Sequence, residues 1–202
     1  MTREELFIEV KTRMDEITPE GQSLPFDDFI DTVLDESARE LLEASPLHIL
    51  TPEAIPVAGT IVVDNKAYIP VPANYIKLYE VKYPLWKKSI RRAITPADPE
   101  YKIQENEYTR GGYARPCVAL LHTSLNGGPA GKYLECSKVV DGTSAPVALY
   151  IKTDLPENLD NKFSNALSWL CVSKLMVIME DSNKAKLAYE QYTNALNLLA
   201  VN

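Results

Sequence analysis

The closing segment, residues 155–202, most constrains the fold because its pattern predicts an α-helical hairpin. Apolar residues recur at helical spacing in two runs, 163–178 and 185–199, on either side of a polar break at 181–183. Small residues are frequent in both runs, and the second is striped by Ala185, Ala188, Tyr192, Ala195 and Leu199. A two-helix hairpin cannot bury both stripes by itself, so we expect it to pack on the rest of the chain or on a neighbour. It offers no chemically reactive motif, which favours a role in assembly.

Residues 2–50 predict two further helices. Thr2 and Glu5 have the spacing of a capping box at the start of the first helix. Its apolar stripe comprises Leu6, Val10, Met14 and Ile17. A loop with two prolines and a glycine follows at 19–25, and the second helix should end near Pro46, which cannot continue it. We expect one side of that second helix to carry Phe26, Phe29, Ile30, Val33, Leu34, Ala38, Leu41 and Leu42.

Residues 51–154 have a different sequence pattern, which predicts short strands separated by turns. Eleven of the 14 prolines and seven of the eight glycines lie between positions 46 and 146. Asp64–Asn65 is suited to a two-residue hairpin turn. Strands are predicted at 60–63, 66–69, 75–83, 89–94, 101–109, 116–123, 132–140 and 147–153. This spacing is typical of a small antiparallel sandwich or barrel.

These regions together predict an α+β protein with two domains. We expect the helices of residues 1–50 and 155–202 to pack as one helical bundle. The β domain, residues 51–154, would then be an insertion between the two helical regions. No internal repeat and no low-complexity segment complicates this division.

The composition is that of an ordinary globular chain, with 46% apolar and 24% charged residues over 202 positions. A formal net charge of −7 argues against tight binding of nucleic acid through its phosphates. Three cysteines without a CxxC pair predict neither a disulfide framework nor a zinc site, and favour a reducing compartment. The charged N-terminus predicts no signal peptide, and no run of 18 apolar residues predicts a membrane span.

Charge is unevenly distributed along the chain. Residues 1–53 hold 14 acidic and four basic side chains, whereas residues 77–92 hold six basic side chains and one acidic one. Copies placed side by side could set an acidic surface against a basic one, as a head-to-tail ring requires. The alternative is that both are ordinary solvated faces.

Two motifs suggest phosphate or metal chemistry, and both have simpler explanations. Asp27, Asp28 and Asp31 match a DDxxD pattern that could hold Mg²⁺, but the second acidic motif of prenyl-transfer enzymes is missing. Acidic residues at a helix start are favourable to its dipole, which explains Asp27. The segment 127–132 resembles a phosphate-binding loop but has Asn126 and Tyr133 where the pattern needs Gly and Ser or Thr. A hairpin tip explains it better.

The sequence predicts no catalytic centre, no cofactor and no metal. Cys117 and His122 lie five residues apart in one predicted strand, so their side chains should point to opposite faces. His48, the other histidine, lies near a helix end. A hydrolase that uses Cys136 or a serine remains an alternative, although no base and orienting group accompany either.

The best candidates for partner contact are basic residues of the β region. Trp86 to Arg92 combines an aromatic ring with four bases, which suits an acidic neighbour, a nucleic acid or a lysine-guarded edge strand. Tyrosines, glycines and arginines at 106–120 suit a sharp turn that projects its arginines, although a plain hairpin would have the same pattern. We take a contact to an acidic neighbour as the functional interpretation. The candidate residues are Lys87, Lys88, Arg91, Arg92, Arg110 and Arg115.

The order of helix, helix, β insertion, helix and helix resembles the head-to-tail adaptor proteins of short-tailed bacteriophages, the tail tubular protein A type. The similarity covers most of the chain as a pattern, with a further likeness to the ring proteins of crAss-like phages. The β region departs from the best-known members between Tyr108 and Leu120. The segments that carry the resemblance are Val33–Leu42, Gly59–Val63, Tyr68–Lys77, Leu155–Pro156 and Ala188–Leu196.

The resemblance implies a non-enzymatic virion protein of the neck or tail, assembled in the host cytoplasm. It implies a homomeric ring, a dodecamer, that contacts the portal protein on one side and tail or other ring proteins on the other. DNA would pass through the lumen without specific binding, and no membrane is involved. The alternatives from the residues are a small enzyme with its site in the β domain and a monomeric binding module that uses the basic strand region.

Overall fold

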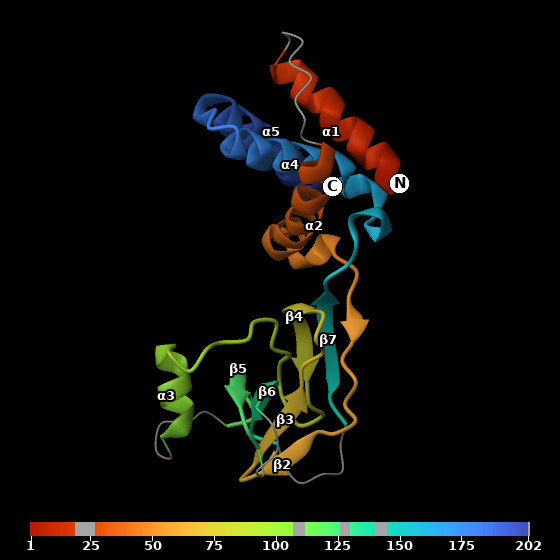
Figure 1. The fold of residues 1–202 in the computed structure, drawn as a ribbon. Helices are drawn as coiled ribbons and strands as arrows, with labels where there is room; N and C mark the ends of the chain where they lie inside the picture. Colours follow the sequence, from red (N-terminus) through yellow and green to blue (C-terminus); the bar gives the residue numbers. More distant parts are fainter. Residues whose placement is uncertain (19–26, 107–111, 126–129, 140–144, 202) are drawn as a thin grey trace. The chain divides into compact units, whose positions relative to one another are not determined.

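The computed structural model describes residues 1–18, 27–106, 112–125, 130–139 and 145–201. It confirms the α+β class, since helices and two antiparallel sheets occur in one chain. The chain divides into two compact units (Figure 1). The helical unit comprises residues 1–50 and 153–202, and the β unit comprises residues 51–152.

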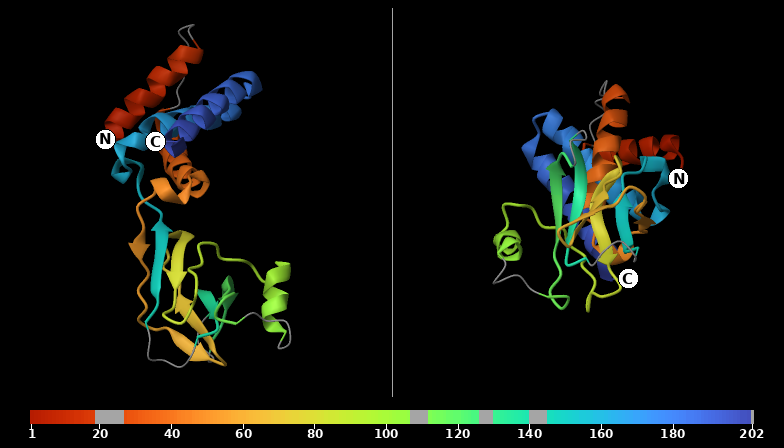
Figure 2. Two further views of the ribbon diagram at one scale, coloured as in Figure 1. Left: turned by 180° about the vertical axis from the view of Figure 1, so that it is seen from behind. Right: turned by 90° about the horizontal axis from the view of Figure 1, so that it is seen from below.

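The helical unit is organised around one central helix. Its α-helices are α1 (Arg3–Ile17), α2 (Asp27–Ala44), α4 (Ser164–Ile178) and α5 (Ser182–Val201), joined with the short 3₁₀ turns η1 (Leu47–Ile49), η2 (Pro156–Asn158) and η3 (Asn161–Phe163). Helix α4 packs against α1, α2 and α5, and its closest partner is α5, which lies beside it in Figures 1 and 2. The predicted capping box is confirmed, because the Thr2 side chain accepts from Glu5 N–H and Thr2 N–H donates to the Glu5 carboxylate.

Burial in the helical unit follows the predicted stripes in part. Leu6, Val10 and Met14 of α1 are buried, as are Ala185, Ala188, Tyr192 and Ala195 of α5. Helix α4 differs from the prediction of a single stripe, because ten of its 15 residues are buried, and eight of them run continuously from Ala166 to Ser173. A helix enclosed by three others has no solvent side over that length.

Phe29 corrects the prediction for α2. The sequence placed it on the apolar side with Ile30 and Val33, but its side chain is 50% exposed, whereas Ile30 is 1% exposed. Phe29 and Ile30 are adjacent, so they project about 100° apart around the helix, and only one can point into the core. An aromatic residue therefore lies on the outside of an acidic helix.

The β unit contains two antiparallel sheets. The first has the order β1 (Glu53–Ala54), β7 (Val147–Lys152), β4 (Tyr75–Lys82). The second has the order β2 (Ile61–Val63), β3 (Lys66–Pro70), β6 (Gly131–Ser137), β5 (Val118–Thr123). The predicted turn at Asp64–Asn65 is confirmed: both residues have positive φ, 51° and 61°, and Val63 pairs with Lys66.

One hydrophobic core serves both sheets. Leu78 and Tyr150 enter it from the first sheet, and Ile69 and Leu134 enter it from the second. Residues outside the strands complete it, notably Trp86, which is 2% exposed. The connecting segments are therefore part of the packing and are held in place by it.

Two predicted strands are wrong. Residues 101–105 of the predicted strand 101–109 belong to a helix, α3 (Pro99–Glu105), which begins after Asp98 with proline at its first position. Residues 89–94 form only isolated bridges, Val81 to Ile90 and Ile94 to Ala119. Both errors fall in the long connection between β4 and β5, where Ile90 and Ala93 pack against the core and Ile90 and Ile94 meet the strands only through isolated bridges.

Candidate functional site

The connection between β4 and β5 forms a groove of about 510 Å³ in the β unit. One wall is the segment 88–94, a second is helix α3, and the third is the approach to β5. Of its described lining residues, four are basic, several are apolar and one is acidic. The lining residues are Lys88, Ser89, Ile90, Arg91, Arg92, Ile94, Glu100, Ile103, Gln104, Arg115, Pro116, Cys117 and Val118.

The basic wall is anchored by main-chain hydrogen bonds and a buried ring. Val81 and Ile90 exchange two hydrogen bonds of 2.8 and 2.9 Å. Further along, Ile94 N–H donates to Val118 O and Leu120 N–H donates to Ile94 O. Trp86 is buried, and its Nε1–H donates to Lys138 O at 3.1 Å. Buried anchors before and after the charged residues fix the backbone and leave the Arg91 and Arg92 side chains exposed.

Helix α3 is positioned by contacts at its start and along its length. Thr95 N–H donates to the Asp98 carboxylate at 2.6 Å, and this hydrogen bond lowers the pKa of Asp98 below its usual range. Tyr101 O–H donates to the buried Glu135 at 3.4 Å. Glu135 also pairs with Lys66 at 2.9 Å, so a polar cluster joins α3 to strands β3 and β6.

The groove is basic because its acids are few. Among the described residues that line it, Lys88, Arg91, Arg92 and Arg115 are basic and Glu100 is the single acid. Arg91 approaches Glu80 at 3.6 Å but keeps 66% of its side chain exposed, so most of its charge is available to a partner.

The structure brings four of the six sequence-predicted contact residues to this groove. They are Lys88, Arg91, Arg92 and Arg115. Lys87 is exposed and does not line the groove, although its N–H donates to Tyr113 O at 3.0 Å. Arg110 lies outside the described residues. The predicted turn before Arg115 is present, because Arg115 N–H donates to Gly112 O at 2.9 Å.

The sequence reading missed the groove's apolar and helical parts. Ile103 is 48% exposed and lines the groove from α3, which was assigned to a strand. Asp98 followed by Pro99 and Glu100 is a helix-start pattern and could have revealed α3. The contribution of Ile90 and Ile94 depends on tertiary packing and has no local signal.

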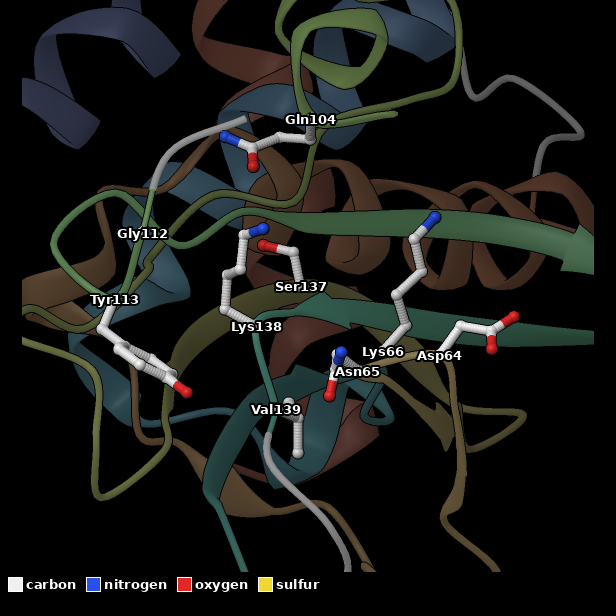
Figure 3. Close-up of a pocket in the computed structure, with 9 residues that line it drawn as sticks. All are labelled: Asp64, Asn65, Lys66, Gln104, Gly112, Tyr113, Ser137, Lys138 and Val139. Carbon is white, nitrogen blue, oxygen red and sulfur yellow. The ribbon is translucent and has the colours of Figure 1, made fainter. Parts of the chain in front are cut away.

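A smaller pocket of about 210 Å³ lies at the end of β6 (Figure 3). Asp64–Lys66, Gln104, Gly112–Tyr113 and Ser137–Val139 line it. Several of its polar groups serve the fold: Ser137 Oγ accepts from Cys117 N–H at 2.8 Å, and Val139 N–H donates to Asn65 O at 2.9 Å. We therefore interpret this pocket as a place where several segments of the β unit are held together, and not as a binding site.

The thiols are poorly suited to nucleophilic chemistry. Burial raises the pKa of Cys117 to about 11 and that of Cys171 to about 12, and it raises the pKa of Cys136 as well. All three thiols therefore stay protonated at neutral pH, and it is the thiolate that attacks. His122 is exposed on β5, and the hydrogen bond between Cys117 N–H and Ser137 holds Cys117 just before that strand.

The acidic motif in α2 is partly occupied by an internal ion pair. Asp31 binds the guanidinium of Arg3 at 2.9 Å, while the side chains of Asp27 and Asp28 lie outside the described set. Within the described parts of the chain, no group of three or more His, Cys, Asp or Glu side chains is placed to hold a metal ion.

The loop at 126–129, part of the segment that resembles a phosphate-binding loop, also lies outside the described residues. The strands on either side of it pair as a hairpin, with Thr123 opposite Gly131.

Comparison with known proteins adds no assignment: no protein-family model matches the chain, and the search of curated proteins finds no match. Among the helices that the structure describes, none combines the length and apolar character needed to cross a membrane.

Proposed function

We propose that the chain is a structural virion protein of a short-tailed phage that assembles into a homomeric ring between portal and tail. The ring is a dodecamer whose lumen conducts DNA. In this proposal the helices from both ends form a bundle, and the β unit is a sandwich inserted between them. The resemblance in element order, described from the sequence, supplies the class.

The observation that carries the proposal is the opposite charge of the two units. The helical unit holds 19 acidic and eight basic residues, a balance of −11, and the β unit holds nine acidic and 13 basic residues, a balance of +4. A subunit with one acidic and one basic unit is suited to head-to-tail contacts, because the acidic part of one copy attracts the basic part of the next. When the rotation between copies closes, such heterologous contacts generate a ring.

The net charge also suits a conduit. DNA carries a dense negative charge, and a wall that bound its phosphates would slow its passage. A subunit with net charge −7 repels DNA on average, so the genome stays mobile in a lumen formed by acidic surfaces.

Native mass spectrometry tests the proposal. We expect rings of a single copy number, either from the purified chain or after it is mixed with its cognate portal protein. The mixture is included because ring formation can depend on the portal as a template. A chain that stays monomeric in both samples contradicts the proposed function.

The basic groove also supports a second candidate function, a monomeric module that binds an acidic peptide. This candidate predicts a monomer in native mass spectrometry. It further predicts saturable binding of a fluorescent acidic peptide that is lost when Arg91 and Arg92 are reversed to glutamate. Rings without such binding would exclude it.

A further inference from the structure

We infer that the basic groove binds an extended acidic segment of a partner protein, which pairs with the main chain of residues 91–93 as an added strand. The inference goes beyond the ring proposed above, because the site lies within one β unit and serves a ring subunit or a monomer equally. It also specifies the binding mode that the second candidate function leaves open. It rests on the course of two segments, on their main-chain groups and on the charge of the lining.

The groove lies between two parallel segments that hydrogen bonds join at both ends. At one end, Lys87 N–H donates to Tyr113 O at 3.0 Å. At the other end, Ile94 N–H donates to Val118 O at 2.9 Å, and Ile94 forms a parallel bridge to β5. Between these ends no main-chain hydrogen bond joins the two segments, all of whose residues are described. The segment 88–93 is therefore held at its ends and is not paired with the opposite wall.

Main-chain donors and acceptors of this wall are unused within the chain. Arg91, Arg92 and Ala93 lie between two bridged residues, in a stretch without turns or bends. Within the described parts of the chain, the N–H and C=O groups of these three residues make no hydrogen bond. A peptide that adds as a strand binds through such groups. Alternate positions, here Arg91 and Ala93, suffice for antiparallel pairing.

The lining carries positive charge that the chain leaves mostly unneutralised. Of its four basic residues, only Arg91 forms an ion pair with a described residue, Glu80, at 3.6 Å. The pKa of Asp98 is lowered mainly by hydrogen bonds from Thr95 and least by the charge of Arg92, which lies beyond ion-pair distance. Carboxylates accept two parallel hydrogen bonds from a guanidinium, so the three arginines suit an acidic peptide. Like charges grouped in this way disfavour a basic one.

The remaining lining favours a peptide over other polyanions. Ile90, Ile103 and Pro116 line the groove beside the basic side chains. An inorganic phosphate would leave this apolar surface uncovered, whereas a peptide with acidic and apolar side chains covers both kinds of lining. None of the described lining residues is aromatic, so the bases of a single-stranded nucleic acid have no ring on which to stack.

Fluorescence anisotropy with the full chain and a labelled peptide, Glu-Val-Glu-Val-Glu-Val-Glu, tests the inference. We expect saturable binding, and R91E/R92E should weaken it by about tenfold or more because like charges then face the peptide. The same peptide with N-methyl groups on alternate residues keeps every charge but loses main-chain donors, and should also bind about tenfold more weakly. NMR should place the perturbed amides at residues 91–93.

Matched controls separate the groove from net charge. K82E/K132E changes two exposed bases of the β unit outside the groove, and should alter the affinity by at most about twofold. A Lys-Val peptide of equal length should not bind. Inorganic tripolyphosphate and oligothymidylate are the competing polyanions, and each should bind more weakly than the acidic peptide. Circular dichroism checks that the variants are folded, since all four substituted residues are exposed.

The outcomes separate this inference from the proposed function. Equal affinity of the wild type and R91E/R92E for the peptide would overturn the inference, as would undiminished binding of the N-methylated peptide. Tighter binding of tripolyphosphate or oligothymidylate would show a different occupant and overturn it as well. Native mass spectrometry measures ring formation separately: rings without peptide binding contradict the inference alone, and peptide binding without rings contradicts the proposed function alone.

Discussion

The two units of this protein build their cores in different ways. In the helical unit one continuous segment, α4, supplies the centre, with ten of its 15 residues buried. In the β unit the core is shared between two sheets and completed by residues of connecting segments, among them Tyr83, Trp86 and Val139. Local sequence therefore carries the core of the first unit, whereas the core of the second depends on contacts between distant segments.

This difference extends to the candidate site. The segments that complete the β core also carry the charged groove, since Trp86 directly precedes the basic residues. In the helical unit the central helix is enclosed, and the acidic side chains lie mostly on α1 and α2 around it. Packing and the candidate groove are thus coupled in the β unit, whereas in the helical unit the core and most of the acidic side chains lie on different helices.

Trp86 offers the strongest test of that coupling. Trp86→Ala removes a buried ring that contacts Tyr83, with ring centroids 5.2 Å apart, and we expect a loss of about 3–5 kcal/mol in the free energy of unfolding. The matched control, Trp86→Phe, keeps an aromatic ring but loses the donor to Lys138 O, and should cost about 1–2 kcal/mol. Denaturant unfolding measures both. A loss for Trp86→Ala no larger than that of a surface substitution would contradict the assigned role of this segment in the core.

Leu170 tests the enclosed helix. Leu170 of α4 is 1% exposed, and Leu170→Ala should destabilise the protein by about 3 kcal/mol because it leaves a cavity. Leu198→Ala in α5 is the matched control. Leu198 is 66% exposed, so the same truncation should change stability by at most about 0.5 kcal/mol. Hydrogen exchange should place the Leu170→Ala effect in amides of the helical unit, and equal effects of the two variants would show that α4 is not the centre.

The sequence predicted the helical unit more accurately than the β unit, because the core of the helical unit is carried by local sequence and that of the β unit by contacts between distant segments. The periodicity of Leu6, Val10 and Met14, or of Ala185 and Ala188, is local and can be counted. Of the β unit, the Asp64–Asn65 turn and most strands were predicted, because turn chemistry and alternation are also local signals. The segment between β4 and β5 was predicted wrongly, because the burial of its apolar residues is determined by tertiary contacts and not by pairing in a β-ladder.

The candidate site likewise has a part that local sequence predicts and a part that it does not. Charge is visible in the sequence, so Lys88, Arg91, Arg92 and Arg115 could be selected, although nothing local showed that they share a groove. Its apolar part could not be selected, since Ile103 was assigned to a strand. Outside the site, Phe29 was likewise assigned to the core of the helical unit. Choosing which of two adjacent residues, Phe29 or Ile30, faces outward requires knowing the partner helices.

Substitution of Asp181 or Asp98 should have the smallest effect on stability. The pair compares single hydrogen bonds in the helical unit and in the β unit. Asp181 directly precedes α5 and accepts from Lys184 N–H at 3.1 Å, and this hydrogen bond lowers its pKa below the ordinary value of 3.8. Because the folded-state pKa lies below the unfolded one, the carboxylate stabilises the fold above pH 4, and the contribution is lost as the pH falls through the folded-state pKa. Asp181→Ala should thus lower the melting temperature at pH 7, and the difference from the wild type should shrink as the pH falls below 3.8.

Asp98→Ala provides the counterpart in the β unit, because the pKa of Asp98 is likewise lowered by its hydrogen bonds to Thr95. We expect the same sign and pH window, but with a further consequence, since Asp98 holds the start of the α3 wall. Paired NMR titrations should show Asp181→Ala perturbing amides around the α4–α5 break, and Asp98→Ala perturbing amides of the groove, including Ile103 and Arg115. If Asp98→Ala leaves the groove amides unchanged, the turn at 95–98 does not position α3, and the coupling between packing and the candidate groove in the β unit rests on Trp86 alone.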